Sequence, residues 1–306
     1  MGTFWTRQYR LVFPEINLEY SDTLRMSFSI KKDLTSEPNE GNFKIWNLNP
    51  DNRKKIEKPD QRVDLYAGYR DNGGVVKMWA GNITQVVSKE EGMDITTEIK
   101  AGDGAMQLRD NWFSLNYPAG TAGDVIVRRI GQEMGLPVTF GENAHFGTFE
   151  SGYSFAGIGR DALDAICYGS GVTWSIQNGV LQIILNGGTT TQQGLVLAPD
   201  SALIGSPERI VKSNPKPDKE NPKRKKRKEN GKIKYEKKAG WRIKTLLVPT
   251  VNPGDAIKVE SRLIKGWFRV ETITHSGDYR GGDWTSEMEL VEGLKPLEVR
   301  NSADQQ

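Results

Sequence analysis

The feature of this sequence that most limits its fold is a pair of similar segments in which apolar and polar residues alternate. Residues 94–100 read DITTEIK and residues 283–289 read DWTSEME, so the two heptads share Asp, Thr and Glu at the same spacing. Thr97 and Ser286 are a close substitution at a fourth position. Strict alternation places successive side chains on opposite faces of an extended chain, which predicts half-buried antiparallel strands.

The segments that precede the two heptads also follow the same order. VDLYAG (63–68) and AIKVES (256–261) alternate in the same way, and each leads through a further extended segment to a turn that contains Gly. Gly, Asp and Ser tolerate the backbone angles that tight turns need. A repeated three-strand meander predicts two similar antiparallel β-barrels or sandwiches in one chain. The alternative is that antiparallel β proteins share such patterns without any duplication.

The middle of the chain, residues 101–185, has a different pattern. Apolar residues spaced by four predict a helix over 121–134, with Thr121 as its N-cap, and a second helix is expected over 160–168. The stretch VTWSIQ-NG-VLQIIL then predicts a hairpin, because Asn-Gly supplies the two positive φ angles of a type I′ turn. These elements indicate a small α/β domain that interrupts the β framework.

The sequence therefore predicts a mainly β fold with a small α/β insertion, in which two similar antiparallel β-barrel domains flank a helix-and-hairpin domain. We expect an N-terminal β-barrel domain over residues 1–102 and an inserted α/β domain over 103–186. A second β-barrel domain is expected over 187–293, including a basic loop at 212–238, and a C-terminal tail over 294–306.

Composition excludes several classes of protein. The chain has 306 residues, which suggests about two domains. No apolar run approaches the roughly 18 residues of a membrane span, and the N-terminus lacks the pattern of a signal peptide. The single cysteine, Cys167, forbids an internal disulfide and fits a reducing compartment. Its apolar neighbours predict a small core residue.

The positive charge is concentrated in one segment. Residues 212–238 contain thirteen Lys or Arg and four Asp or Glu, a local charge of +9. The whole chain carries +3, so the remainder carries −6. The run KRKKRK (223–228) has the flanks of a solvated loop, and three interpretations stay open: an extended charged loop, contact with an acidic neighbour, and contact with nucleic acid.

Candidates for catalysis are weak. With one cysteine and two histidines, His145 and His275, a Cys/His zinc cluster is not expected. Asp103 and Asp110 could be a glycosidase pair, but carboxylates at turns are common. For His275 a hydrogen bond that stabilises a turn is the expected role rather than catalysis. Phosphate-binding glycine motifs are absent from the sequence, so no cofactor is expected.

Several stretches together resemble the tailed-phage baseplate hub family, of the late-control, contractile-tail type. In the N-terminal part these are IWNL (45–48), DNRKKI (51–56) and LYAGY (65–69), in that order. The stretch GRDALDAICYGSGVTWSIQNGVLQII resembles the inserted domain of such hubs. TLLVPTVNPGDAIKVES and GWFRVETITHSGDYRGGDWTSEMEL resemble their second barrel. The resemblance covers most of the chain except the basic segment and the tail.

This resemblance implies a structural hub of a phage tail baseplate, not an enzyme. It implies a homotrimer that adapts a sixfold tail tube to a threefold central spike, in the virion tail, assembled in the host cytoplasm. The implied partners are the tail tube protein, the central spike protein and other baseplate and tape-measure proteins, with DNA passing transiently through the lumen.

The candidate partner-binding residues are those of the basic run: Lys223, Arg224, Lys225, Lys226, Arg227 and Lys228. Two alternatives remain for the whole chain. One is a nucleic-acid-binding β-barrel protein that uses the basic segment, and the other is a tail-associated cell-wall hydrolase. A long non-contractile tail is a further possible setting.

Overall fold

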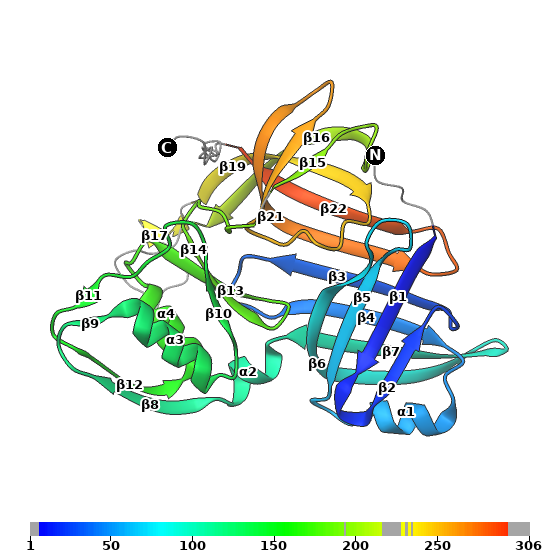
Figure 1. Cartoon of the computed structure of the whole chain (residues 1–306), viewed down its shortest axis with the longest axis horizontal. Coiled ribbons are helices and arrows are strands. Elements are labelled where there is room, and N and C mark those ends of the chain that lie inside the picture. The colour runs from blue at the N-terminus through cyan, green and yellow to red at the C-terminus, as the bar shows by residue number, and fades with distance from the viewer. Residues whose placement is uncertain (1–5, 193, 216–227, 230–231, 234, 293–306) are drawn as a thin grey trace, which may run out of the picture.

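The structure is a computed structural model that describes residues 6–192, 194–215, 228–229, 232–233 and 235–292. Strands predominate in these residues, which confirms the mainly β fold class. Figure 1 shows three groups of elements, which we name the N-terminal β-unit, the central α/β unit and the C-terminal β-unit. The expected tail over 294–306 lies outside the described residues.

The N-terminal β-unit follows from strongly alternating segments that bury one face. In β3, for example, Met26, Phe28 and Ile30 are buried while Ser29, between Phe28 and Ile30, is exposed. The elements are β1 (Arg7–Phe13), a 3-10 helix (Pro14–Ile16), β2 (Leu18–Ser21), β3 (Met26–Asp33), β4 (Asn39–Trp46), α1 (Pro50–Ile56), β5 (Arg62–Tyr69), β6 (Gly74–Glu91) and β7 (Asp94–Asp103).

The central α/β unit has its own apolar core, which α3 and α4 cover. Its elements are α2 (Ala105–Asp110), β8 (Trp112–Tyr117), β9 (Thr121–Ala122), α3 (Gly123–Glu133), β10 (Val138–Phe140), β11 (Thr148–Phe149), β12 (Tyr153–Ile158), α4 (Gly159–Cys167), β13 (Val172–Gln177) and β14 (Val180–Leu185). Cys167 is buried in this core, as predicted, and burial raises the pKa of its thiol to about 12.

The predicted helices and hairpin of this unit are confirmed, but one cap is wrong. The N-cap of α3 is Ala122, which makes no side-chain cap hydrogen bond. Thr121 instead lies in β9, where its Oγ1 donates to the carbonyl of Pro118 at 2.8 Å. The Asn-Gly turn has the expected geometry, since Asn178 and Gly179 have φ of 58° and 79°.

The C-terminal β-unit contains the second heptad. Its elements are β15 (Leu195–Leu197), β16 (Leu203–Pro215), β17 (Lys228–Glu229), β18 (Lys232–Ile233), β19 (Tyr235–Leu246), β20 (Ala256–Glu260), β21 (Lys265–Asp278) and β22 (Trp284–Val291). A separate apolar core lies within this unit.

The strand order of the two β-units repeats. The N-terminal β-unit has the order β3-β4-β7-β6-β5, and the C-terminal β-unit has β16-β19-β22-β21-β20, with antiparallel pairing throughout. The heptad DITTEIK begins β7, and DWTSEME covers the start of β22. The two heptads therefore occupy equivalent strands, as predicted. Closure of each unit into a barrel, and the domain boundaries, stay predictions.

A matching irregularity strengthens the equivalence. The β6–β7 ladder shifts register between Ile83 and Gln85, and the β21–β22 ladder shifts between Val270 and Thr272. Directly after each shift, Gln85 of β6 pairs with Lys100, and Thr272 of β21 pairs with Glu289. Lys100 and Glu289 are the last residues of the two heptads. A β-bulge inserts one residue and bends the strand locally. Two bulges at one equivalent position indicate a duplicated unit rather than a shared β pattern.

The polar residues in the middle of the heptads make equivalent cross-strand contacts. Ser88 pairs with Thr97, and their hydroxyl oxygens lie 3.2 Å apart. His275 pairs with Ser286, and its Nδ1 lies 2.8 Å from the serine Oγ. The units differ at their edges, since β1 runs antiparallel to β5 whereas β15 runs parallel to β20.

Strand pairing also joins the two β-units to each other. β21 pairs antiparallel with β3 over Thr272–Asp278, so the strands of both units other than β17 and β18 form one 13-stranded sheet. Gly277 stands at this joint, opposite Phe28 on one side and Trp284 on the other. The Phe28 and Trp284 rings meet edge to face with centroids 5.3 Å apart.

We expect Gly277→Ala to destabilise the protein by about 1–3 kcal/mol, because a buried site would be overpacked. A Cβ at Gly277 would lie 2.4 Å from the Phe28 ring and 2.8 Å from Trp284. Gly282→Ala in the same hairpin is the matched control, since a Cβ there meets nothing within 4 Å. The measurement is the denaturant midpoint of both variants. Equal midpoints would contradict the tight packing of this joint.

Candidate functional site

A lysine lies in the interior where the three units meet. Lys32 is on β3 and is fully buried. It continues the inward face of Met26, Phe28 and Ile30, because side chains in a strand alternate between faces. An ammonium removed from water must have hydrogen-bond partners, because an unpaired buried charge costs several kcal/mol.

Each unit supplies one acceptor to the Lys32 ammonium. Nζ donates to the carbonyl oxygen of Met78 on β6 at 2.5 Å, to Asn178 Oδ1 in the β13–β14 turn at 2.8 Å, and to Asn252 Oδ1 before β20 at 2.9 Å. Asn178 Nδ2 also donates to Asn252 Oδ1 at 3.1 Å. These residues, with Lys32, form what we call the Lys32 junction.

Two buried carboxylates hold the loops of the Lys32 junction in place. Asp103, at the end of β7, accepts from the backbone N–H groups of Asn178 at 2.5 Å and Gly179 at 2.8 Å. Asp255 accepts from the backbone N–H of Asn252 at 2.8 Å and from Thr190 Oγ1 at 2.5 Å. Each carboxylate therefore fixes one of the asparagines that contact Lys32.

Burial is the largest influence on the pKa values of Lys32, Asp103 and Asp255. It lowers the pKa of Lys32 to about 8, against the attraction of Asp103 and Asp255. It raises the pKa of Asp103 to about 7, against the two backbone N–H donors and the ammonium. The pKa of Asp255 is raised for the same reason. The Lys32 ammonium and the carboxylates of Asp103 and Asp255 thus stabilise one another within a desolvated site.

The structure does not combine Asp103 and Asp110 as an acid pair. Asp103 is buried, and both its oxygens are used by the hairpin turn. Asp110 ends α2, where the Arg109 guanidinium binds both its oxygens at 2.6 Å and holds its pKa below the ordinary value. The two carboxylates have different environments and different partners.

Neither histidine lies in an arranged catalytic group. His275 is fully buried within β21 and contacts Ser286 across the ladder, so it does not stabilise a turn as expected. Burial lowers its pKa well below the ordinary value, since the ring is desolvated and Lys32 is near. His145 is exposed and its Nδ1 lies 2.9 Å from Asp124 Oδ2.

A cleft of about 790 Å³ lies between the N-terminal β-unit and the central unit, and three of its charged lining residues already have ion-pair partners. Arg62 and Lys77 both bind Asp64, at 2.9 and 3.1 Å, and Arg109 binds Asp60 at 3.0 Å. In the described part of the chain, no group of three or more His, Cys, Asp or Glu could hold a metal ion. No helix among those residues is long and apolar enough to cross a membrane.

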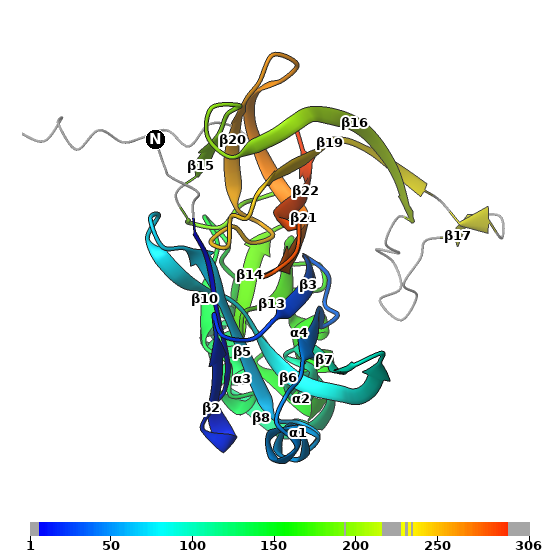
Figure 2. The same ribbon diagram turned by 90° about the vertical axis from the view of Figure 1, so that its right-hand side faces the viewer.

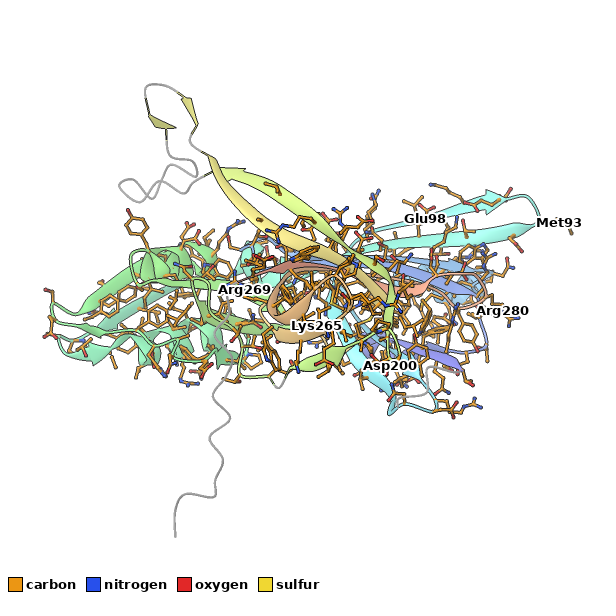
Figure 3. All side chains as sticks on the ribbon, turned by 90° about the horizontal axis from the view of Figure 1, so that it is seen from above. Met93, Glu98, Asp200, Lys265, Arg269 and Arg280 are labelled. Carbon is orange, nitrogen blue, oxygen red and sulfur yellow. The ribbon has the colours of Figure 1, made fainter. Side chains whose placement is uncertain are left out.

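The ends of the basic segment lie in a long two-stranded arm formed by β16 and β19. The ladder continues to the pairs Lys212↔Lys238 and Pro215↔Tyr235. Figure 2 and Figure 3 show this arm extending away from the body of the chain. Lys223, Arg224, Lys225, Lys226 and Arg227 lie outside the described residues, and of Lys228 only the backbone is described, in β17.

A second projection is the hairpin of β6 and β7. Met93 at its tip is fully exposed and is labelled in Figure 3. Figure 2 shows that this hairpin and the β16–β19 arm extend to the same side of the chain. The β16–β19 arm lies at one end of the strand order, whereas β6 and β7 lie within it, and both projections place strand edges where another chain can reach them.

We expect Lys32→Met to destabilise the protein by about 3–5 kcal/mol at pH 7.5, because three acceptors and the Asp103 carboxylate lose the ammonium. The cost should be smaller at pH 5. The pKa of Asp103 is raised to about 7, so below that value the carboxyl is neutral and needs no counter-charge.

Lys31→Met is the matched control, since Lys31 directly precedes Lys32 in β3 and is exposed. It should change the free energy of unfolding by less than about 0.5 kcal/mol at both pH values. The measurement is denaturant unfolding of both variants at pH 5 and pH 7.5. An equal cost of Lys32→Met at the two values would contradict an ionised Asp103 at neutral pH.

No protein-family model and no curated protein sequence matches this chain. Solved structures do. The 43 kDa tail protein of prophage MuSo2 from Shewanella oneidensis matches with a TM-score of 0.61 and 13% identity, over 94% of this chain and 98% of that one. A tail protein from Neisseria meningitidis MC58 matches with a TM-score of 0.63 and 10% identity, over 94% and 97%.

A third match is an E. coli component of the type VI secretion system, whose structure is similar to bacteriophage T4 tail proteins. Its TM-score is 0.54 with 12% identity, over 89% of this chain and 74% of that one. At these identities the likeness concerns the fold. The chain therefore has the fold of phage tail proteins, as the sequence resemblance to baseplate hubs predicted.

Proposed function

We propose that this protein is a structural hub of a phage tail baseplate. The observation that carries the proposal is the combination of a tail-protein fold with an internal duplication of the β-unit. The fold supports a structural role in the tail. The duplication gives the chain two similar units, which is the property that a symmetry adaptor needs. The proposed role is structural rather than enzymatic.

The proposed assembly is a homotrimer at the distal end of the tail tube. Three copies of a chain with two similar β-units present six similar units around one axis, within the closed symmetry normal for oligomers. Such a ring contacts a sixfold tail tube on one side and a threefold central spike on the other. In this way one protein joins two partners of different symmetry.

The proposed location is the baseplate of a contractile tail, in the virion, after assembly in the host cytoplasm. The proposed partners are the tail tube protein, the central spike protein and other baseplate and tape-measure proteins. DNA would pass transiently through the open centre of the ring. Structures of other tail and secretion proteins with this fold support an association with the tail.

We expect the purified chain to assemble into a trimer, because the β-units leave strand edges exposed. Native mass spectrometry across a range of protein concentrations measures the mass, and the copy number in tail particles provides the same test in the assembly. A stable monomer at every concentration, or six copies per particle, would contradict the proposed adaptor.

The basic run 223–228 is proposed to contact an acidic surface of a partner subunit. The run belongs to residues 212–238, whose local charge of +9 must be solvated or face negative charge, and the rest of the chain carries −6. Exposed ion pairs are worth only about 0–1 kcal/mol each, so the run acts through their number. Salt screens such pairs and should weaken the contact.

We expect replacement of the six Lys and Arg of 223–228 by Gln to reduce assembly into tails, with a smaller salt dependence than the wild type. Replacement of the Lys residues by Arg keeps the charge and serves as control. Both variants should unfold like the wild type. Normal tail assembly of the Gln variant at all salt concentrations would make the run a dispensable loop, and loss of DNA binding alone would favour the nucleic-acid interpretation.

A further inference from the structure

Two pairs of equivalent strands differ in their partners. β21 and β3 pair with each other, whereas their equivalents, β6 and β16, have no corresponding partner among the described residues. In β21 the residues after the bulge pair with β22 on one side, over Thr272–Gly277, and with β3 on the other, over Thr272–Asp278. The equivalent residues of β6, Gln85–Glu91, pair with β7 alone among the described residues. β3 pairs with β4 and β21, whereas β16, its equivalent, pairs with β19 alone within the described part of the chain.

We propose that β16 of one copy of this chain pairs antiparallel with residues 85–91 of β6 in a second copy. The contact repeats between chains the β3–β21 pairing that joins the two units within a chain. One change of position and orientation relates the two β-units of a chain. The same change, repeated at the edge of β16, places the N-terminal β-unit of a second copy there. This inference rests on the proposed trimer and names the surfaces that form it.

The equivalences fix the register of this contact. Within the chain, Ser29 on β3 pairs with Ser276 on β21. Lys89 is equivalent to Ser276, since each stands four residues after its shifted bulge pair, Gln85 or Thr272. Glu208 is equivalent to Ser29 through neighbouring strands, as the ladders Glu208↔Arg242↔Glu289 and Ser29↔Asn42↔Lys100 correspond. Glu208 therefore faces Lys89 of the second copy.

The register continues through neighbouring residues of both strands. The pairs that follow are Ser88 with Arg209, Val87 with Ile210 and Val86 with Val211. Apolar residues thus meet apolar residues at two consecutive positions, and opposite charges meet at the position of Lys89 and Glu208. Cross-strand apolar pairs and opposite charges both stabilise an antiparallel ladder.

Exposure supports the same assignment. Val211 is 63% exposed although it lies on a strand, and Val86 is half-buried. Ile273, the equivalent of Val86, is fully buried because β3 covers its strand. A long edge strand with an exposed valine favours strand addition by another chain. The two edges also belong to the hairpins that extend to the same side of the chain in Figure 2.

The contact is heterologous, since each copy gives its β16 to one neighbour and its β6 to the other. A heterologous contact forms a ring when its rotation closes. In a ring of three copies, three pairings within chains and three between chains would alternate. The strands of all copies would then form one continuous sheet with no free edge at these positions.

The test is a cysteine cross-link between copies. A variant with both Val87→Cys and Ile210→Cys should form disulfide-linked dimers and trimers on mild oxidation, because directly opposite Cβ atoms lie about 4.5–5.5 Å apart. The control carries Val87→Cys and Val211→Cys, whose side chains point to opposite faces of the sheet and should not link. Cys167 is buried and stays in both variants.

A second variant probes the contact without cysteine. Val211→Glu should weaken trimer formation about tenfold or more, since a charge would face Val86 of the neighbour. Val125→Glu on α3 is the matched control, because Val125 is 52% exposed and lies outside the proposed contact. Both variants should unfold at the same denaturant concentration as the wild type.

The outcomes separate this inference from the proposed function. A trimer by native mass that gives no Val87–Ile210 cross-link, and that Val211→Glu leaves intact, would overturn the strand pairing and leave the hub proposal standing. Cross-linking of the Val211 control in place of Ile210 would overturn the register. A wild-type monomer would contradict both the trimer and the pairing. The expected result is a trimer in which the Val87–Ile210 cysteine pair forms a cross-link and the Val87–Val211 control pair does not.

Discussion

The interior position of the Lys32 ammonium is the constraint on which the arrangement of the three units depends. A buried cation is tolerated only when its donors are satisfied, and here the acceptors come from Met78, Asn178 and Asn252. Those residues belong to the N-terminal β-unit, the central unit and the C-terminal β-unit. Moving any one unit away would leave a charge or an acceptor buried without a partner, so the Lys32 junction penalises separation of the units.

Strand pairing adds a second connection, with a different physical origin. The β3–β21 ladder satisfies backbone groups that would otherwise form two exposed edges, and it merges the two β-units into one sheet. Lys32 lies on the same strand, opposite Ile273. The polar junction and the shared sheet therefore act at one place, where the duplicated units meet.

The duplication relates this joint to the proposed assembly. One edge of β21 pairs with β3 inside the chain, while the equivalent edge of β6 has no partner strand among the described residues. A second copy could therefore repeat at β6 the contact that β3 makes with β21. Assembly through β16 and β6 would need no new kind of interaction, because the chain already contains an example of it. The tail-protein fold and the proposed ring are thus linked by one structural element, the strand edge after the bulge.

Period-two alternation, the Asn-Gly turn and the matched heptads determined the mainly β class, the inserted hairpin and the equivalence of β7 and β22, because these depend on local backbone geometry. Lys32 also follows Met26, Phe28 and Ile30 at the same period of two. That spacing is the one sequence signal that the lysine side chain points inward. Only the tertiary structure decided the partners of Lys32 and the role of Asp103, since the groups that satisfy a buried charge come from residues far apart in the chain. It also decided which edges are paired, because strand order across units depends on packing that no local pattern encodes.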